Sequence, residues 1–272
     1  MKLAIRSLCK SYVATRGTIN ALSDIQLLVA AAEFVSLVGT SGCGKSTLLH
    51  IVGGLEAASS GTVELDGERV RGPGAELGLV LQHQTLFPWL TVLENVRFPY
   101  TLRHQRVRPA ADEELANRAL LVENLLRLVG LWDFRNSYPA ELSGGMQQRA
   151  AIARALVARP DVLLMDEPFG ALDSQTREEM QELLLHVNAL HRTTTLFVTH
   201  DVDEALLLSD RVVVLSPRPG RIIGDIRVPF ARDRRAAELK LDPDFVQLKR
   251  QVMALLRHQT DRGSALQSLN GR

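Results

Sequence analysis

The chain has 272 residues, of which 46% are hydrophobic and 23% are charged, and its formal net charge is +1. This length predicts one large hydrophobic core with a small appended subdomain, and the two cysteines are too few for a disulfide framework or a zinc site. The balanced charge argues against a dedicated nucleic-acid binder, and no apolar run approaches the roughly 20 residues of a membrane-spanning helix.

The N-terminal segment predicts strands rather than a targeting signal. Its first residues lack the long apolar region of a signal peptide, so we expect a cytosolic chain. Apolar residues alternate over residues 2–8, and the segments 25–29 and 62–65 also have the character of strands. Together they predict a smaller antiparallel sheet beside an α/β core.

A phosphate-binding pattern follows the next predicted strand. Residues 34–38 are a short apolar run, and residues 39–46 then have the pattern GxxxxGK[ST] before a predicted helix. Glycines let such a loop turn its backbone N–H groups inward, which favours a polyphosphate over a glycine-rich turn without a ligand. We expect Lys45 to contact the β- and γ-phosphates, Ser46 to ligate Mg²⁺ and Thr47 to reach the α-phosphate. The expected nucleotide contacts are Gly39, Thr40, Ser41, Gly42, Cys43, Gly44, Lys45, Ser46 and Thr47.

The middle of the chain predicts an inserted helical subdomain at about residues 88–160. An apolar segment first ends at Gln82, a polar residue at a predicted strand end, although an isolated Gln is usually a surface residue. Helical spacing then predicts three helices, and Pro160 ends the subdomain. These helices cover residues 92–100, 110–129 and 145–158.

A second glycine-rich helix start, Leu142-Ser-Gly-Gly-Met-Gln-Gln-Arg149, lies inside this subdomain. Such a start presents backbone N–H groups and the positive end of the helix dipole to an anion. Two openings of this kind predict a nucleotide that is held from two sides.

Two carboxylates, Asp166 and Glu167, end an apolar strand predicted from residue 162. Ligands bind outside the carboxyl ends of parallel strands, which would bring these acids to the phosphate-binding loop. We expect Asp166 to hold Mg²⁺ and Glu167 to polarise the attacking water. Taken alone, the pair would be interpreted as solvated carboxylates before a turn at Pro168, and the upstream phosphate-binding loop reverses that preference.

His200 and Asp201 repeat this pattern after the run of β-branched and aromatic residues at 195–199. A histidine at that sheet edge can reach a γ-phosphate. The alternative, equally supported by the local sequence, is that Asp201 caps the helix predicted over 202–208 and that His200 makes a local hydrogen bond.

The last part of the chain predicts a hairpin and an amphipathic helix. Residues 216–221 form a turn between two strand-like runs, and a plain hairpin connection is as well supported as a special role. Beyond the charge-rich residues 231–235, the apolar residues of the segment 243–256 fall on one helix face and predict packing onto the core. They are residues 245, 248, 252 and 255 or 256. We expect a flexible tail from Gly263.

Residues 3–228 resemble the ATP-hydrolysing subunit of an ATP-binding cassette (ABC) transporter, because the family's motifs occur in order. The segment 142–149 resembles the family signature and is the most specific match. The resemblance implies an α/β fold, with a P-loop NTPase core, a small antiparallel β subdomain and an inserted α-helical subdomain. It also implies an ABC ATPase domain over residues 1–230 and a C-terminal helical extension and tail over residues 231–272.

The family's roles transfer to matching positions of this sequence. Tyr12 resembles the aromatic residue that stacks on adenine, and residues 39–47 resemble the Walker A loop. Gln82 resembles the Q-loop glutamine, a further Mg²⁺ ligand, and His200 resembles the switch histidine. The remaining matches are Asp166 and Glu167 in the Walker B segment and Asp173 in the D-loop of the dimer. The expected catalytic set is Lys45, Gln82, Glu167 and His200.

The resemblance also implies partners. In the family two subunits meet head to tail, so Ser143, Gly144 and Gly145 of one chain would close on the ATP that Lys45 of the other chain holds. The expected partners are a second copy or a related ATPase subunit, membrane permease subunits and an extracytoplasmic solute-binding protein, without nucleic acid. The chain would be a peripheral protein at the cytoplasmic face of the inner or plasma membrane.

Several short segments further resemble importers of the nitrate, sulfonate and taurine group, which take up small anionic solutes. They are residues 72–76, 82–83, 86–90, 169–173 and 216–221. Two positions depart from the family pattern: Ala32 stands where glycine is usual, and Thr40 stands where proline is frequent. Neither position supplies an expected catalytic atom.

Other classes of function remain alternatives. They are another ABC importer or exporter, a soluble ABC ATPase of translation or DNA maintenance, and a nucleotide-binding module without catalysis. Translation-type chains normally carry two cassettes, and DNA-type chains insert a long coiled coil between the segments that correspond to Ser46 and Ser143 here. Gln82, Glu167 and His200 argue against a module that has lost catalysis.

Two further expectations concern single side chains. Phe87 and Trp89 are expected both to anchor the helical subdomain and to offer an apolar groove to a partner helix. Cys43 lies inside the phosphate-binding loop and is expected to be oxidisable or alkylatable when ATP is absent. The simpler interpretation of Cys43 is a small residue that fits between two glycines.

Overall fold

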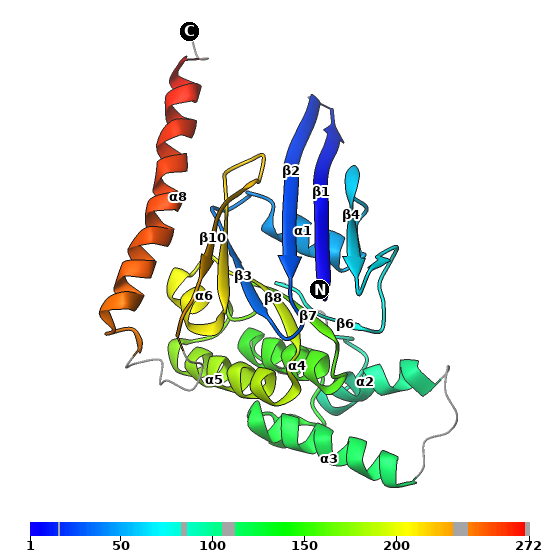
Figure 1. Cartoon of the computed structure of the whole chain (residues 1–272). Coiled ribbons are helices and arrows are strands. Elements are labelled where there is room, and N and C mark those ends of the chain that lie inside the picture. The colour runs from blue at the N-terminus through cyan, green and yellow to red at the C-terminus, as the bar shows by residue number, and fades with distance from the viewer. Residues whose placement is uncertain (16, 83–85, 105–111, 231–238, 270–272) are drawn as a thin grey trace. The chain divides into compact units, whose positions relative to one another are not determined.

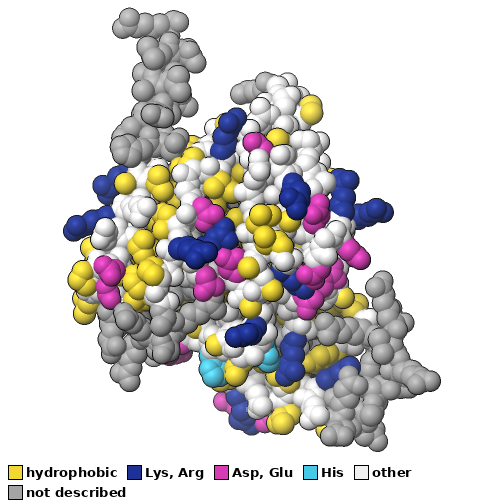
Figure 2. Space-filling model, viewed as in Figure 1, with side chains coloured by type: hydrophobic (Ala, Val, Ile, Leu, Met, Phe, Trp, Pro, Cys, Tyr) yellow, Lys and Arg dark blue, Asp and Glu magenta, His cyan; other side chains and the backbone are white. Residues whose placement is uncertain are grey.

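The computed structural model describes residues 1–15, 17–82, 86–104, 112–230 and 239–269 (Figure 1). The chain divides into two compact units. Unit 1 comprises Met1–Leu77 and Arg192–Arg272, and unit 2 comprises Gly78–His191. Within the described ranges no helix combines the length and the apolar character that crossing a membrane requires. On the face drawn in Figure 2, Lys and Arg side chains lie among Asp and Glu side chains rather than in a separate basic area.

A four-stranded antiparallel sheet in unit 1 confirms the predicted smaller sheet. Its strands are β1 (Leu3–Ala14), β2 (Gly17–Val29), β4 (Ser60–Leu65) and β5 (Glu68–Arg69), in the order β2-β1-β4-β5. Both β1 and β2 are longer than predicted. Their far ends pair through the main chain, as Val13 does with Thr18, while the first four residues of β2 are exposed. Strand residues that are exposed need not alternate between apolar and polar side chains. The sequence pattern therefore did not predict these extensions.

The second sheet of unit 1 contains the strand that precedes the phosphate-binding loop. β3 (Phe34–Val38) lies between β8 (Thr194–Val198) and β9 (Arg211–Leu215) and is parallel to both, and β10 (Ile222–Arg227) pairs antiparallel with β9. β3 and β8 are buried at every residue, including the polar Ser36, Thr194 and Thr195, as expected for central strands of a parallel sheet. Because Leu37 pairs with Val198, the loops that follow β3 and β8 leave the sheet at one edge.

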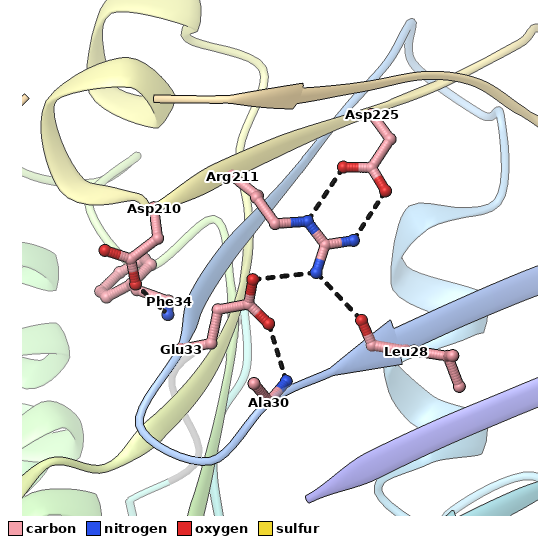
Figure 3. Close-up of polar contacts among 7 residues, drawn as sticks. All are labelled: Leu28, Ala30, Glu33, Phe34, Asp210, Arg211 and Asp225. Atoms are coloured by element: carbon pink, nitrogen blue, oxygen red, sulfur yellow. Dashed lines mark hydrogen bonds and ion pairs between the residues drawn. The ribbon is translucent and has the colours of Figure 1, made fainter. Parts of the chain in front are cut away.

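Arg211 joins the strand starts at the opposite edge of this sheet (Figure 3). Its guanidinium donates to both carboxylate oxygens of Asp225 at 3.0 and 2.6 Å, to Glu33 at 2.9 Å and to the Leu28 carbonyl at 3.0 Å. Glu33 in turn accepts from the Ala30 N–H at 2.7 Å. The network therefore ties the end of β2 to the turn before β3 and to the β9–β10 pair.

Helix α8 (Pro243–Leu269) packs its predicted apolar face onto unit 1, beside α6 (Val202–Leu208) (Figure 1). Phe245 and Val252 are buried, and Leu248 packs partly buried against the same cluster. This confirms the predicted amphipathic helix. The helix continues to Leu269, past Gly263 where the tail was predicted to begin, and the flexibility of that segment stays a prediction. The charge-rich residues 231–235 lie outside the described residues.

Unit 2 contains two strands and the predicted helices. β6 (Leu77–Val80) and β7 (Val162–Asp166) are neighbours, and β7 is buried throughout. The helices are α2 (Val92–His104), α3 (Asp112–Leu128), α4 (Gly144–Val157) and α5 (Ser174–His191), with short 3₁₀ turns at Trp132–Phe134 and Pro139–Glu141. Both α2 and α3 pack against α4. The predicted helical subdomain, residues 88–160, lies inside this unit, while the domain boundary at residue 230 stays a prediction.

Candidate functional site

The phosphate-binding loop in unit 1 has the backbone that its glycines predict. Gly42 and Gly44 have φ of 74° and 106°, a conformation that residues with a Cβ rarely adopt. A Cβ at Gly44 would lie 2.6 Å from the Leu22 side chain, so the position is closed to larger residues. Helix α1 (Lys45–Val52) starts directly after Gly44 without a side-chain cap and without an acidic residue in its first turn. Its first N–H groups are therefore suited to an anion.

Lys45 lies within this loop rather than on the surface. Its side chain is buried, with the residue 6% exposed, and its ammonium donates to the carbonyl oxygens of Gly39 at 2.8 Å and Thr40 at 3.2 Å. The Ser46 and Thr47 side chains are half-buried beside it. The structure thus brings a cation, two hydroxyls and a helix N-terminus together around one turn.

Cys43 fills a space inside the loop. It is 1% exposed, and a Cβ at Gly39 would lie 2.7 Å from its Sγ. Burial raises the pKa of the Cys43 thiol, against the lowering effect of Lys45. A buried thiol with a raised pKa has little of the reactive thiolate. The expected alkylation of Cys43 is therefore not supported, and the simpler packing interpretation is favoured.

Tyr12 and His200, from other elements of unit 1, lie at this end of the sheet. The Tyr12 hydroxyl approaches Thr47 Oγ1 at 3.5 Å, its ring is 38% exposed, and the Lys10 ammonium lies 4.8 Å from the ring centroid. His200 is exposed and lies two residues after the end of β8. Asp201 accepts hydrogen bonds from two N–H groups at the start of α6, which confirms that it caps this helix.

Unit 2 holds the predicted carboxylates and the glutamine together. Asp166 ends β7 and is 2% exposed. Glu167 follows with φ of 44°, an unusual conformation for a residue with a side chain. The Gln82 amide donates to Glu167 Oε2 at 3.5 Å. The amide oxygen of Gln82 and the carboxylate of Asp166 are donors of the kind that Mg²⁺ prefers, and they are the part of the predicted donor set that lies in unit 2.

The signature segment is exposed at the start of α4. The Ser143 hydroxyl caps the helix by accepting from the Met146 N–H at 3.3 Å, and Ser143 and Gly144 are exposed. The first turn of α4 contains no acidic residue. This helix N-terminus therefore presents a hydroxyl and N–H groups outward, as the sequence predicted.

The D-loop packs beside this start. A Cβ at Gly145 would lie 3.3 Å from the Leu172 side chain and 3.4 Å from the Ala171 carbonyl oxygen. Asp173 caps α5, because its carboxylate accepts from the Thr176 N–H at 3.0 Å and the Thr176 hydroxyl at 2.7 Å. The hydrogen bond from the Thr176 N–H lowers the pKa of Asp173 first of all. Asp173 therefore has a structural role in its own chain, and its predicted dimer role stays a prediction.

Gln148 was missed among the candidate residues. It is 1% exposed within α4, and its amide donates to the Leu81 carbonyl at 3.4 Å, one residue before Gln82. The signature helix and the Gln82 segment are thereby joined inside unit 2. A buried polar residue in a helix usually has a specific hydrogen-bond partner and is therefore a candidate. The sequence of residues 142–149 alone does not show that position 148 is buried.

The two aromatic residues after the Gln82 segment differ in their surroundings. The Phe87 ring packs 4.4 Å from the Phe98 ring and 5.5 Å from the Trp89 ring, measured between centroids. Trp89 is 70% exposed. Phe87 thus anchors the helical part of unit 2, while Trp89 is available on its surface. Residue 83, part of the predicted subgroup pattern, lies outside the described residues.

Comparisons with known proteins agree with these motifs. The sequence pattern of the ABC transporter family matches residues 22–170. The nitrate import ATP-binding protein NrtD of Synechocystis sp. is 43% identical over 274 residues, covering 98% of this chain and 100% of NrtD. The taurine import ATP-binding protein TauB of Jannaschia sp. is 44% identical over 258 residues, covering 93% of each chain.

A solved structure agrees as well. The dimeric, post-hydrolysis structure of the ATP-binding cassette MJ0796 bound to ADP and Pi has a TM-score of 0.74 and 33% sequence identity to this chain. It covers 84% of this chain and 100% of its own. The chain therefore belongs to the ABC transporter family and carries the family's ATPase domain.

Proposed function

We propose that this chain is the ATP-hydrolysing subunit of an ABC importer that drives uptake of a small anion, of the nitrate, sulfonate or taurine type, through a separate permease. The observation that carries the proposal is the phosphate-binding loop with its buried Lys45, uncapped α1 N-terminus and neighbouring Tyr12. The similarity to nitrate and taurine import ATP-binding proteins supports the solute class.

The proposed roles follow the chemistry of each side chain. Lys45 and the loop N–H groups bind the phosphates of ATP, and the exposed Tyr12 ring stacks on its base. Glu167 orients and polarises the attacking water, and His200 contacts the γ-phosphate. Residues of both units are assigned to one nucleotide because the family's motifs occur in order along the chain. The assignment does not use a distance between residues of the two units.

A magnesium ion fits the donors proposed for it, which are the Ser46 hydroxyl, the Gln82 amide and the Asp166 carboxylate. When bound, Mg²⁺ neutralises charge on the phosphate oxygens. The 3.5 Å contact from the Gln82 amide to Glu167 keeps that carboxylate beside Gln82.

The proposal includes a dimer in which Ser143, Gly144 and Gly145 of one chain meet the ATP held by the other. The exposed hydroxyl and N–H groups at the start of α4 suit that role, and the MJ0796 cassette is dimeric. Membrane permease subunits and an extracytoplasmic solute-binding protein complete the proposed complex at the cytoplasmic membrane face. The exposed Trp89 is a candidate contact for the permease.

Substitution of the proposed water-polarising carboxylate tests the ATPase mechanism. Glu167→Gln should lower kcat by at least about 10²-fold while ATP still binds, because the amide cannot accept the proton of the attacking water. Phosphate release and nucleotide affinity are the measurements. Glu178→Gln, at an exposed position on α5, is the matched control and should leave both unchanged. Unchanged turnover in Glu167→Gln would refute its assignment.

Uptake tests the transport function. Cells that lack the chain and receive it on a plasmid should recover uptake of labelled nitrate or taurine, whereas cells that receive the Lys45→Ala variant should not. Recovery for one solute identifies the class. If the wild-type chain restores uptake of neither nitrate nor taurine while the permease is present, the proposed solute group is wrong. That result would not count against ATP hydrolysis.

A further inference from the structure

The loop between β9 and β10, residues 216–221, contacts the phosphate-binding loop inside unit 1. The sequence left open whether this proline-rich turn is more than a hairpin connection. In the structure the Arg218 guanidinium donates from Nε and Nη2 to the Gly42 carbonyl oxygen, at 3.4 and 3.2 Å. Two residues later, a Cβ at Gly220 would lie only 2.2 Å from the Cys43 carbonyl oxygen. The turn thus touches two consecutive carbonyl groups of the phosphate-binding loop.

The turn is internally fixed. The Ser216 N–H donates to the Arg221 carbonyl at 2.9 Å, and the Arg221 N–H donates to the Ser216 hydroxyl at 3.0 Å. The same hydroxyl lies 3.0 Å from the carbonyl oxygens of Pro217 and Pro219. Ser216 is 8% exposed, so these bonds are shielded from water. The backbone that carries Arg218 is therefore held in place.

The turn is also fixed to β2. The Gly220 N–H donates to the Ala21 carbonyl at 2.8 Å, and the Ser23 N–H donates to the Gly220 carbonyl at 3.0 Å. Glycine is required at position 220 because any side chain would meet the Cys43 carbonyl. These contacts leave Arg218 anchored at its backbone, with its exposed side chain at the Gly42 carbonyl of the phosphate-binding loop.

The Gly42–Cys43 peptide follows a residue with an unusual backbone conformation. Gly42 has φ of 74°, and glycine restricts its own backbone less than any other residue. The C=O and N–H of a trans peptide point in opposite directions. A cation bound to the Gly42 carbonyl therefore holds this peptide from one side, while on the other side the Cys43 N–H donates to the Thr40 carbonyl of the same loop at 3.3 Å. Concave sets of directed N–H groups are what bind phosphate in such loops.

We propose that Arg218 is a positioning residue of the nucleotide site, which holds the Gly42–Cys43 peptide of the phosphate-binding loop in its phosphate-binding orientation. The proposal rests on the proposed ATP site and adds to it a part supplied by the β9–β10 turn. Arg218 acts through the backbone of Gly42 and makes no contact with the phosphates themselves.

The test compares three variants of the full chain. Arg218→Ala should raise KM and Kd for MgATP about five- to tenfold, the effect of losing one exposed hydrogen bond of ordinary strength, with kcat changed less than about twofold. Arg218→Lys, which keeps the charge and a donor, should fall between wild type and Arg218→Ala. Arg221→Ala, an exposed residue in the same turn, should match wild type. ATP titration, steady-state kinetics and thermal melting are the measurements.

The outcomes separate positioning from general effects. A wild-type Kd in Arg218→Ala overturns the proposal. So does a rise in Kd that Arg221→Ala reproduces, or that disappears at high salt, because either result indicates long-range charge rather than a fixed peptide. If Arg218→Ala lowers the melting temperature, the Arg218→Lys variant decides between the explanations. A wild-type melting temperature and a raised Kd in Arg218→Lys support positioning. A wild-type Kd in Arg218→Lys overturns the proposal.

Failure of the underlying ATP site is distinguished by Lys45→Ala. If Lys45→Ala binds ATP as wild type does, the proposed nucleotide site is wrong and the role of Arg218 falls with it. If Lys45→Ala loses binding while Arg218→Ala retains it, the site stands and the inference about Arg218 alone is wrong.

Discussion

At the residue scale, Ala32 occupies a backbone position that suits glycine. Its φ is 61°, and its N–H donates to the Thr194 hydroxyl at 3.0 Å in the turn before β3. A left-handed conformation costs a residue with a Cβ roughly 1–2 kcal/mol. The departure from the family pattern at this position is therefore a site of local strain.

Ala32→Gly should raise the free energy of unfolding by about 1 kcal/mol, because relief of this strain exceeds the extra chain entropy of glycine. Ala31→Gly is the matched control: Ala31 lies in the same turn and is not among the described positive-φ residues. It should lower stability by up to about 1 kcal/mol. Urea unfolding of both variants is the measurement, and equal effects of the two substitutions would contradict the explanation.

Cys43 is expected to react slowly with alkylating reagents. Its thiol is buried and burial raises its pKa, so the thiolate fraction near neutral pH is small and rises only above the ordinary thiol pKa. In a Cys9→Ala variant, iodoacetamide should label the folded chain at least about tenfold more slowly than the chain unfolded in guanidinium at the same pH. Equal labelling rates would show that Cys43 is accessible.

At the element scale, the Arg211 network holds together strands that the chain order separates. Arg211 and Glu33 have side chains 17% and 15% exposed, so their 2.9 Å ion pair is largely shielded from water. The bidentate bond to Asp225 raises the pKa of Arg211, against the effect of burial, and Glu33 raises it further. Arg211 is therefore positively charged throughout the neutral and mildly alkaline range.

Arg211→Met should lower the free energy of unfolding by about 2 kcal/mol, since it leaves the half-buried Glu33 carboxylate without this cation and the Leu28 carbonyl without this donor. Because the raised pKa keeps the charge below strongly alkaline pH, the difference from wild type should be constant between about pH 7 and about pH 10. Arg227→Met, at the exposed paired position on β10, should change stability by less than about 0.5 kcal/mol. Similar losses in both variants would argue against the network.

The helices and strands show how far hydrophobic patterns in the sequence predict the bounds of secondary-structure elements. β3 and α6 have the predicted bounds, because a mostly apolar segment before glycine predicts the strand and the N-cap residue Asp201 predicts the start of the helix. β5, two residues long, and the 3₁₀ turns were not predicted, since so few residues have no periodicity. Helix α8 exceeds its predicted end because the apolar pattern stops at residue 256 while the backbone stays helical.

At the scale of the whole molecule, the proposed head-to-tail dimer makes each ATP site depend on two chains. Ser143→Arg removes the signature hydroxyl and adds a bulky cation, and Lys45→Ala removes the phosphate contact. Neither variant alone should hydrolyse ATP. A heterodimer of the two has one site with Lys45 from one chain and Ser143 from the other, so an equal mixture should regain about a quarter of the intact sites.

Phosphate release from the mixture, with each variant alone as control, measures this complementation. Activity that is absent from each variant alone and greatest in the equal mixture supports the composite site. If either variant alone is fully active, or if the mixture stays inactive while wild-type chains dimerise with ATP, the two-chain model is wrong.

The sequence by itself determined the chemistry and the order of the motifs. Lys45, Glu167, Ser143 and His200 were identified as candidates because glycine-rich loops and polar residues after buried strands have local patterns that need no tertiary information. The family followed from the same segments and is confirmed by the comparisons. Their roles stay predictions that the proposed variants test.

Only the tertiary structure decided the contacts between segments that are distant in the sequence. The burial of Cys43, the bond from Gln148 to the Leu81 carbonyl and the position of Arg218 on the phosphate-binding loop depend on which elements pack together. Long-range packing leaves no period in one sequence, because the partner residues lie far apart along the chain. The sequence therefore determined the chemistry of the site, and the fold decided which residues support it.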